Sequence, residues 1–513
     1  MVACQWVCVL LWASTIGADE NVVKIDSGEI RGTTSERADD VRVFRGIPYA
    51  ASTAGANRWK PPQPVAKWDG IRDCTKFGPA CPQPVYPKES VYYRDPETQS
   101  EDCLRLNVWS AAKDSSEKRP VMVWIHGGAL TRGSGAIDIY EGTSLAKKGV
   151  VVVTINYRLG PLGFFAHPDL TKESSEHASG NYGFLDQVAA LEWVKRNIAA
   201  FGGDPGCVTI FGESAGAMSV CVMTVSPLTK GLFHRAISES GSAFLELPSL
   251  SASEDRGRQL QDLVKAKSLA ELREVSPEEL MKNSEKRVGP NIDGWCIKED
   301  ALATFKAGKQ HDVPTIVGAN GDEMTTLAPV AIRPKTKRAL DIQVALLIGN
   351  PKEVEKLYPA NSDEEATQAF LDIAGDSTFT MPARIWARLD TKLGAKAYLY
   401  HFEHISEATK ALGAFHASEI AVVFDNLDRL KHPSNDEERA LAQTMSTYWT
   451  TFAKTGNPNG SGTPDWLPYN ESEEPTMVFG SPAKIGHHIR KEKLDLLEGL
   501  MEKRRGKGDA AAR

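Results

Sequence analysis

The feature that most constrains the fold is a series of short, continuous apolar segments rich in β-branched residues. Five of them recur along the chain, at residues 121–125, 150–155, 207–211, 314–317 and 397–400. A strand that is apolar at every position is buried on both faces. Because helical patterns separate these segments, the sequence predicts an α/β fold with a large, mostly parallel central sheet and helices on both of its faces.

The clearest helical pattern lies between the second and third of these segments. Its apolar residues recur at steps of three and four and form one stripe: Phe184, Val188, Leu191, Val194 and Ile198. A Gly-Gly pair and an Asp-Pro turn follow the stripe. These residues predict a helix end that leads directly into the next strand.

Length and composition exclude several classes of protein. The 513 residues carry a net charge of −7, with 41% hydrophobic and 25% charged residues. These values are near the average for globular proteins and argue against a disordered chain, a fibre or a membrane bundle. The mild acidity also argues against nucleic acid or an anionic membrane as the main partner. Length alone suggests about three domains, but no internal repeat or clear linker divides the chain.

The two ends differ from the rest of the chain. An apolar run ending in small residues predicts a secretory signal peptide at 1–18 and therefore an exported protein. The run is too short to span a bilayer and no later segment offers 18 uninterrupted apolar residues, so no stable membrane insertion is expected. We expect a single large domain at 19–500 and a disordered basic tail at 501–513. The charged, helical segment 249–287 is expected to insert between strands and roof the functional site.

The cysteines are sparse. Beyond the leader they are Cys74, Cys81, Cys103, Cys207, Cys221 and Cys296. No paired Cys-x-x-Cys spacing is present, so the sequence predicts no zinc site. One or two disulfides and otherwise buried thiols are expected in an exported protein.

The strongest chemical signal is Gly-Glu-Ser-Ala-Gly at residues 212–216, between a predicted strand and a predicted helix. A serine at such a sharp turn projects its hydroxyl away from the sheet, and the flanking glycines leave room for the strained backbone. The N-terminus of the following helix favours negative charge that develops at this point. The pattern therefore predicts Ser214 as a nucleophile.

A second loop fits the same chemistry. His-Gly-Gly-Ala-Leu at residues 126–130 follows the strand 121–125. Small residues let backbone amides approach a tetrahedral oxyanion without an intervening side chain. The loop is therefore a candidate oxyanion hole.

A serine nucleophile also needs a base and an acid. Most of the 11 histidines lie in polar loops or beside strands, whereas His416 follows a glycine and enters an apolar segment. Asp322 and Glu323 follow the strand 314–317, at the end of the sheet where α/β proteins gather their sites. Spacing alone does not choose between these two acids.

Several ordered blocks make the chain resemble the type-B carboxylesterase/cholinesterase family of α/β-hydrolases, from about residue 23 to about residue 468. The blocks are Phe-Arg-Gly-Ile-Pro-Tyr-Ala at 44–50, Glu-Asp-Cys-Leu at 101–104, Asn-Tyr-Arg-Leu-Gly at 156–160, Asn-Tyr-Gly-Phe-Leu-Asp-Gln at 181–187, and residues 211–216. The chain is more similar to general carboxylesterases than to cholinesterases.

The resemblance implies roles for particular residues. The family's acid falls on Glu323 and its histidine on His416, which together with Ser214 would form a catalytic triad. The oxyanion donors fall on the amides of Gly128, Ala129 and Ala215. The family disulfide would join Cys81 to Cys103, with Cys74 as a competitor.

The implied reaction needs no metal and no organic cofactor. His416 would take the proton of Ser214 as its oxygen attacks an ester carbonyl, and Glu323 would stabilise the imidazolium. Water activated by His416 would then hydrolyse the acyl-enzyme. Glu213 would support the site as a buried carboxylate, and the partner would be a small-molecule ester.

Departures from the family pattern narrow the substrate class. Cholinesterases carry a tryptophan in the loop between the two cysteines, where it binds a quaternary ammonium. This chain has Tyr86, Tyr92 and Tyr93 there instead, which disfavours choline esters. Relatives with a Gly-Gly-Gly or Gly-Gly-Ala loop often accept esters of bulky alcohols, and residues 127–129 fit that group.

The leading hypothesis is thus a secreted serine carboxylesterase. An amidase or peptidase using the same triad is one alternative. The other is a catalytically silent adhesion module, which usually lacks the serine and carries a membrane stalk. The physiological ester and the oligomeric state are not indicated by the sequence.

Overall fold

The computed structural model describes residues 21–511 except 96, 286 and 461, and for 507–511 it describes the backbone alone. Eleven strands of this part form one sheet in the order β14-β13-β12-β11-β10-β9-β7-β8-β6-β4-β3. Their bounds are β3 (Thr33–Ser35), β4 (Ala38–Pro48), β6 (Arg105–Ser110), β7 (Arg119–Ile125), β8 (Val151–Ile155), β9 (Gly203–Glu213), β10 (Arg235–Glu239), β11 (Thr315–Asn320), β12 (Ala397–Phe402), β13 (Pro475–Phe479) and β14 (Lys484–His487). A small second sheet contains β1 (Val22–Ile25), β2 (Gly28–Arg31) and β5 (Ile71–Asp73).

The centre of the large sheet is parallel. The strands from β8 through β7, β9, β10, β11 and β12 to β13 pair in parallel, and the flanking pairs are antiparallel. Each of the five predicted apolar segments forms one of these parallel strands. The predicted fold class is therefore confirmed.

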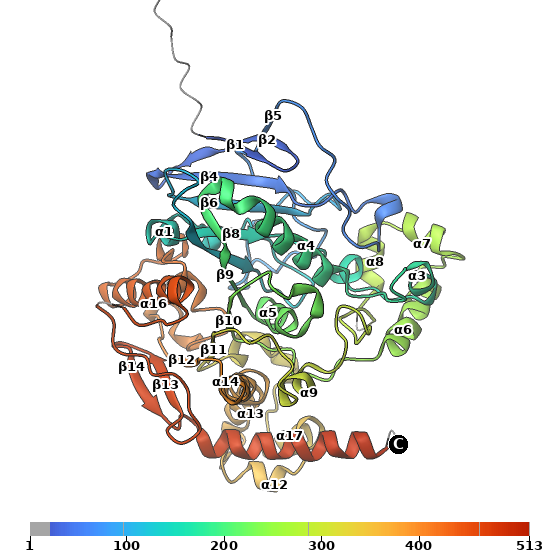
Figure 1. The fold of residues 1–513 in the computed structure, drawn as a ribbon. Coiled ribbons are helices and arrows are strands. Elements are labelled where there is room, and N and C mark those ends of the chain that lie inside the picture. Colours follow the sequence, from blue (N-terminus) through green and yellow to red (C-terminus); the bar gives the residue numbers. More distant parts are fainter. Residues whose placement is uncertain (1–20, 96, 286, 461, 512–513) are drawn as a thin grey trace, which may run out of the picture.

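Helices cover both faces of the sheet (Figure 1). Their bounds are α1 (Thr143–Lys147), α2 (Gly160–Gly163), α3 (Pro168–Glu173), α4 (Tyr182–Asn197), α5 (Ala215–Val225), α6 (Leu250–Leu263), α7 (Leu269–Glu274), α8 (Pro277–Asn283), α9 (Ala301–Lys306), α10 (Met324–Leu327), α11 (Lys337–Leu347), α12 (Pro351–Val354), α13 (Glu365–Gly375), α14 (Met381–Leu393), α15 (Ile420–Val423), α16 (Asp436–Thr455) and α17 (Lys491–Ala511). The predicted helical stripe lies on α4, which Gly202 follows in the left-handed conformation.

The alternation of side chains along β7 shows why two layers of helices are needed. Val121 and Val123 pack into a core that also contains residues of α4, α5 and α14. Met122 and Trp124 point to the opposite face and pack with residues of α15 and α16. Because side chains alternate along a strand, one apolar strand supplies both cores.

The C-terminal helix α17 continues beyond residue 500, where the sequence predicted a disordered tail. Leu494, Leu497 and Leu500 are buried against the core. Arg505 forms an ion pair with Asp300 at 3.0 Å, so the basic residues of this end hold the helix to the body of the protein. The predicted signal peptide at 1–18 lies outside the described residues.

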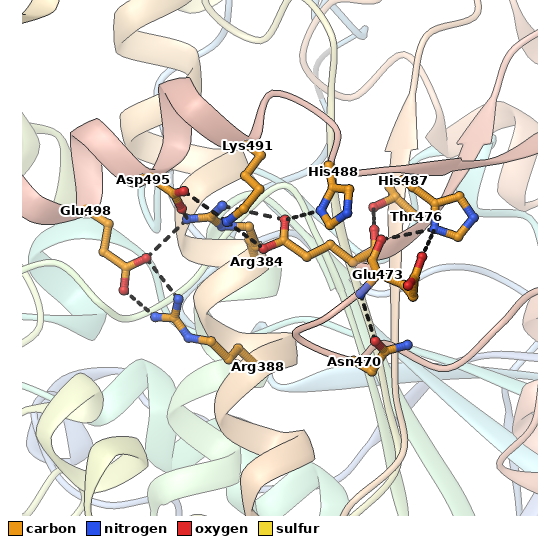
Figure 2. Close-up of polar contacts among 11 residues, drawn as sticks. Arg384, Arg388, Asn470, Glu473, Thr476, His487, His488, Lys491, Asp495 and Glu498 are labelled. Carbon is orange, nitrogen blue, oxygen red and sulfur yellow. Dashed lines mark hydrogen bonds and ion pairs between the residues drawn. The ribbon is translucent and has the colours of Figure 1, made fainter.

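Buried arginines connect α17 to the sheet (Figure 2). Arg384 of α14 donates a hydrogen bond to Asp495 at 2.7 Å and to Glu498 at 3.3 Å, and it lies 3.7 Å from Glu474 beside β13. Arg388, one turn further along α14, also pairs with Glu498.

None of the helices in the described part of the chain is long and apolar enough to cross a membrane.

Candidate active site

Ser214 occupies the turn between β9 and α5. Its backbone has φ 57° and ψ −120°, a strained conformation for a residue with a side chain. The turn is fixed by the amide of Ser214, which donates to the carbonyl of Glu239 at the end of β10 at 2.8 Å. The structure therefore has the sharp strand-to-helix turn that the sequence pattern predicts.

The two glycines around this turn are required by the neighbouring strand β7. A Cβ atom at Gly216 would lie 1.9 Å from the carbonyl oxygen of Ile125, and one at Gly212 would lie 2.5 Å from the same oxygen. Any side chain at either position would force β7 and the turn apart. The spacing of the motif therefore reflects close packing of α5 against the strand.

The loop after β7 passes directly beside the serine. A Cβ atom at Gly127 would lie 3.1 Å from Cβ of Ser214. Gly128 and Ala129 both have positive φ, 105° and 56°, which turns the backbone at this point. The amides of these two residues donate to no backbone carbonyl within the described residues, so they are free to bind a ligand oxygen.

His416 and Glu323 form a buried pair. His416 lies between β12 and α15, and its Nδ1 is 2.5 Å from Oε2 of Glu323, which directly precedes α10. Both side chains are almost fully buried. Asp322, the other acid that the spacing allowed, instead accepts a hydrogen bond from the amide of Ala414 at 2.8 Å. Asp322 thus holds the loop that carries the histidine, while Glu323 contacts the ring.

A second carboxylate faces the other side of the ring. Nε2 of His416 lies 3.0 Å from Oε1 of Glu213, the residue before the serine. Burial alone lowers the pKa of His416, but the charges of Glu213 and Glu323 outweigh burial and raise this pKa well above its usual value. Burial raises the pKa of Glu213, and the nearby imidazole opposes this change.

Sequence reasoning missed further polar residues around this pair. Asn320 donates its amide to Glu323 at 2.7 Å and its side chain to the carbonyl of Phe415 at 2.9 Å, which joins the acid to the histidine loop. Tyr92 donates to the carbonyl of His416 at 3.0 Å. Burial raises the pKa of Glu419, three residues after the histidine, to about 8. No spacing pattern marks these residues, because they converge only in the folded chain.

Ser214 and His416 open into one cavity of about 220 Å³. The cavity walls are mainly apolar and aromatic, and include Tyr86, Tyr92, Tyr140, Phe402, Phe415 and Val422. The rings of Tyr86 and Tyr92 lie 5.6 Å apart, so the loop that lacks tryptophan does contribute aromatic side chains to the site. The cavity therefore offers mainly apolar walls to a bound ligand.

The predicted roof of the site lies elsewhere. Segment 249–287 forms α6, α7 and α8, but none of its described residues lines the cavity. Helix α8 packs against α2 and α6, and α7 packs against the turn at residues 55–57. Because a charged helical composition indicates an insertion but not its position, the sequence could not place it.

The cysteines expected to form a disulfide are both buried thiols in this structure. The neighbouring Cys81 thiol, together with burial, raises the pKa of the Cys103 thiol, so the two side chains lie close together. Cys74, the sequence-level competitor, is also a buried thiol. The Cys81–Cys103 bond therefore stays a prediction.

No group of three or more His, Cys, Asp or Glu residues in the described chain is arranged to hold a metal ion.

The parallel sheet, the strained serine turn and the buried histidine–glutamate pair define an α/β-hydrolase. Comparisons with known proteins agree: the carboxylesterase family pattern matches residues 19–497. The chain is 37% identical to the fumonisin B1 esterase of Sphingopyxis macrogoltabida, over 90% of this chain and 87% of that protein. It is 36% identical to the para-nitrobenzyl esterase of Bacillus subtilis, over 92% and 97%.

Solved structures extend the similarity to three dimensions. A Geobacillus stearothermophilus carboxylesterase superposes with a TM-score of 0.83 at 34% identity, covering 93% of this chain and all of that one. A PNB esterase structure gives the same TM-score and identity. The chain belongs to the carboxylesterase family and is a carboxylic ester hydrolase.

Proposed function

We propose that this protein hydrolyses carboxylic esters through an acyl-enzyme on Ser214. His416 acts as the general base, and Glu323 orients and stabilises the imidazolium. The observation that carries the proposal is the 2.5 Å contact between His416 and Glu323 in the same cavity as a strained serine turn. In unliganded enzymes the bond from histidine to serine often tightens only when substrate binds.

The amides of Gly128, Ala129 and Ala215 stabilise the oxyanion in this mechanism. Each such donor contributes about 3 kcal/mol to lowering the barrier. The N-terminus of α5 adds its positive dipole end at the same point. The glycines of the loop let these amides approach the carbonyl oxygen closely.

The test is hydrolysis of p-nitrophenyl acetate and butyrate by the wild type and Ser214→Ala. The variant should fold normally, as judged by circular dichroism, and lose at least ~10³-fold in kcat/KM. Near-wild-type activity in this variant would refute the assignment of the nucleophile. Parallel assays with p-nitroanilides test the amidase alternative. Turnover of the esters should be much faster than turnover of the anilides.

We also propose that the substrate range includes esters of bulky alcohols. Supporting this, the loop at residues 127–129 carries only one methyl group as a side chain, which leaves room beside the nucleophile for a branched leaving group. Turnover of tert-butyl acetate is the test. Failure to hydrolyse any tertiary-alcohol ester would remove this part of the proposal.

Secretion is a further part of the proposal, supported by the apolar leader at 1–18. Expression of the full chain with its leader should yield mature protein outside the cytoplasm. Its N-terminal sequence should begin close to Asp19. Recovery of the protein with Met1 and the apolar run still attached would contradict export.

A further inference from the structure

One short segment gathers much of the exposed apolar surface of the molecule. Of the 14 large hydrophobic side chains that are exposed in the described part of the chain, six lie within residues 327–347. They are Leu327, Val330, Ile332, Ile342, Leu346 and Leu347. An even spread along the chain would place fewer than one in so short a stretch. Apolar clusters of this kind mark interaction surfaces.

Helix α11 shows that the exposure is systematic. Leu340 and Val344 are buried, as expected for the inner face of an amphipathic helix. The opposite face carries Ile342 and Leu346, one turn apart, where polar side chains would normally lie, and Arg338 lies one turn before them. Ile342 and Leu346 are 54% and 74% exposed.

Hydrogen bonds hold this surface in place. The guanidinium of Arg333 donates to the carbonyls of Thr325 and Ala328 at the end of α10. The side chain of Gln343 on α11 donates to the carbonyl of Ile332 at 2.5 Å. The loop and the helix therefore present their apolar side chains together.

Most of the charged residues beside the apolar side chains are cations. Residues 327–347 contain four cations and one acid, the exposed Asp341, in a protein whose net charge is −7. One of the cations, Lys337, lies 3.4 Å from Glu355. Lys335 and Arg338 are exposed beside the apolar face. At the other end of α11, Arg504 of α17 donates to the carbonyl of Leu347 and brings the exposed Lys503 with it.

The surface also reaches the active site. Leu327, at its start, lines the cavity that contains Ser214. The surface therefore adjoins the wall of the cavity at this residue.

We propose that residues 327–347 dock the enzyme onto an anionic lipid–water interface. Apolar side chains flanked by lysine and arginine are the features that bind a protein in the plane of such an interface. A second copy of this chain fits less well, since a symmetric contact would bring the same cations face to face. The proposal extends the esterase function and does not depend on which ester is hydrolysed.

The experiment is flotation of the full-length protein with vesicles of phosphatidylcholine containing 30% phosphatidylglycerol. Replacing Ile342→Asn and Leu346→Asn together should reduce the bound fraction at least 10-fold. The matched control, Leu263→Asn with Leu467→Asn, removes two leucines outside the segment that are 46% and 47% exposed and should bind as wild type does. Hydrolysis of dissolved p-nitrophenyl acetate should be unchanged in all variants.

Charge is tested separately with Lys335→Gln and Arg338→Gln. This pair should weaken binding to anionic vesicles, and 0.5 M salt should weaken binding of the wild type in the same way. Binding of the apolar double variant at the wild-type level would overturn the proposal, as would absence of wild-type binding. If the wild type forms a dimer and does not bind vesicles, and the apolar double variant is a monomer, the surface would be assigned to a second copy of the chain instead.

Discussion

At the scale of single residues, the site is defined by carboxylates that are buried around one imidazole. Glu213 and Glu323 contact opposite nitrogens of His416. Two such neighbours hold a proton on the ring more tightly than one would. Catalysis by a general base needs the ring to be neutral, so these charges set the pH at which activity begins.

Glu213→Gln should shift the acidic limb of the kcat/KM profile to lower pH. Removing the charge near Nε2 disfavours the imidazolium and lowers the pKa of His416, so that the neutral base persists to lower pH. Glu438→Gln is the control, since Glu438 also lines the cavity but pairs with His404. If the acidic limb of the Glu213 variant lies at the same pH as that of the wild type, this carboxylate does not influence the pKa of the base.

Glu323→Gln and Asp322→Asn separate the two acids that spacing left open. Loss of the carboxylate that contacts the histidine should lower kcat on the order of 10⁴-fold, as for other triads. Asp322→Asn changes only a hydrogen bond to the amide of Ala414, and it should retain most of the activity. Steady-state kinetics on p-nitrophenyl butyrate measures both, and equal losses would contradict the assignment.

At the scale of elements, the chain segment between Cys81 and Cys103 shapes the site. This loop carries Tyr86 and Tyr92 into the cavity, and its two ends meet at the neighbouring thiols. A bond between them would therefore fix the loop as well as stabilise the fold.

We expect Cys81 and Cys103 to form a disulfide when the protein folds under oxidising conditions. For a loop of this length the bond should stabilise the protein by about 3 kcal/mol. Peptide mapping should find the linked pair with Cys74 still free, and Cys103→Ser should lower the urea midpoint of the oxidised protein only. A bond from Cys74 to either partner would contradict the prediction.

At the scale of the whole molecule, α17 closes the structure by packing across α14 near the sheet edge (Figures 1 and 2). Its leucines contribute to the core, and its acids meet the arginines of α14. Helix and body are thus joined by apolar burial and by partly buried ion pairs.

Arg384→Leu should cost about 3 kcal/mol of unfolding free energy, since it removes a buried guanidinium that pairs with the buried Glu474 and with two acids of α17. Lys392→Gln, also on α14, removes an exposed pair with Glu471 and should cost 1 kcal/mol or less. Urea denaturation measures both. Equal effects would show that the buried network of Figure 2 does not anchor α17.

The fold was largely predictable because its strongest determinants are local. Continuous apolar strands such as 150–155 must be buried on both faces, and α4 carries its stripe in one unbroken run. The positions of segment 249–287 and of the C-terminal tail were harder to predict, because they depend on residues far away in the chain. Arg505, for example, pairs with Asp300 across about 200 residues.

The sequence by itself determined the class of protein. Short local patterns predict the strands and the serine turn, and they give the order of Ser214, Glu323 and His416 along the chain. The tertiary structure showed the contact between Glu323 and the ring that the family resemblance implied. It alone decided that segment 249–287 does not line the cavity and that Glu213 faces Nε2. It also decided that apolar and basic side chains form one surface at residues 327–347. The physical reason is the same throughout: local patterns fix backbone and burial, whereas contacts between distant side chains exist only after the chain has packed.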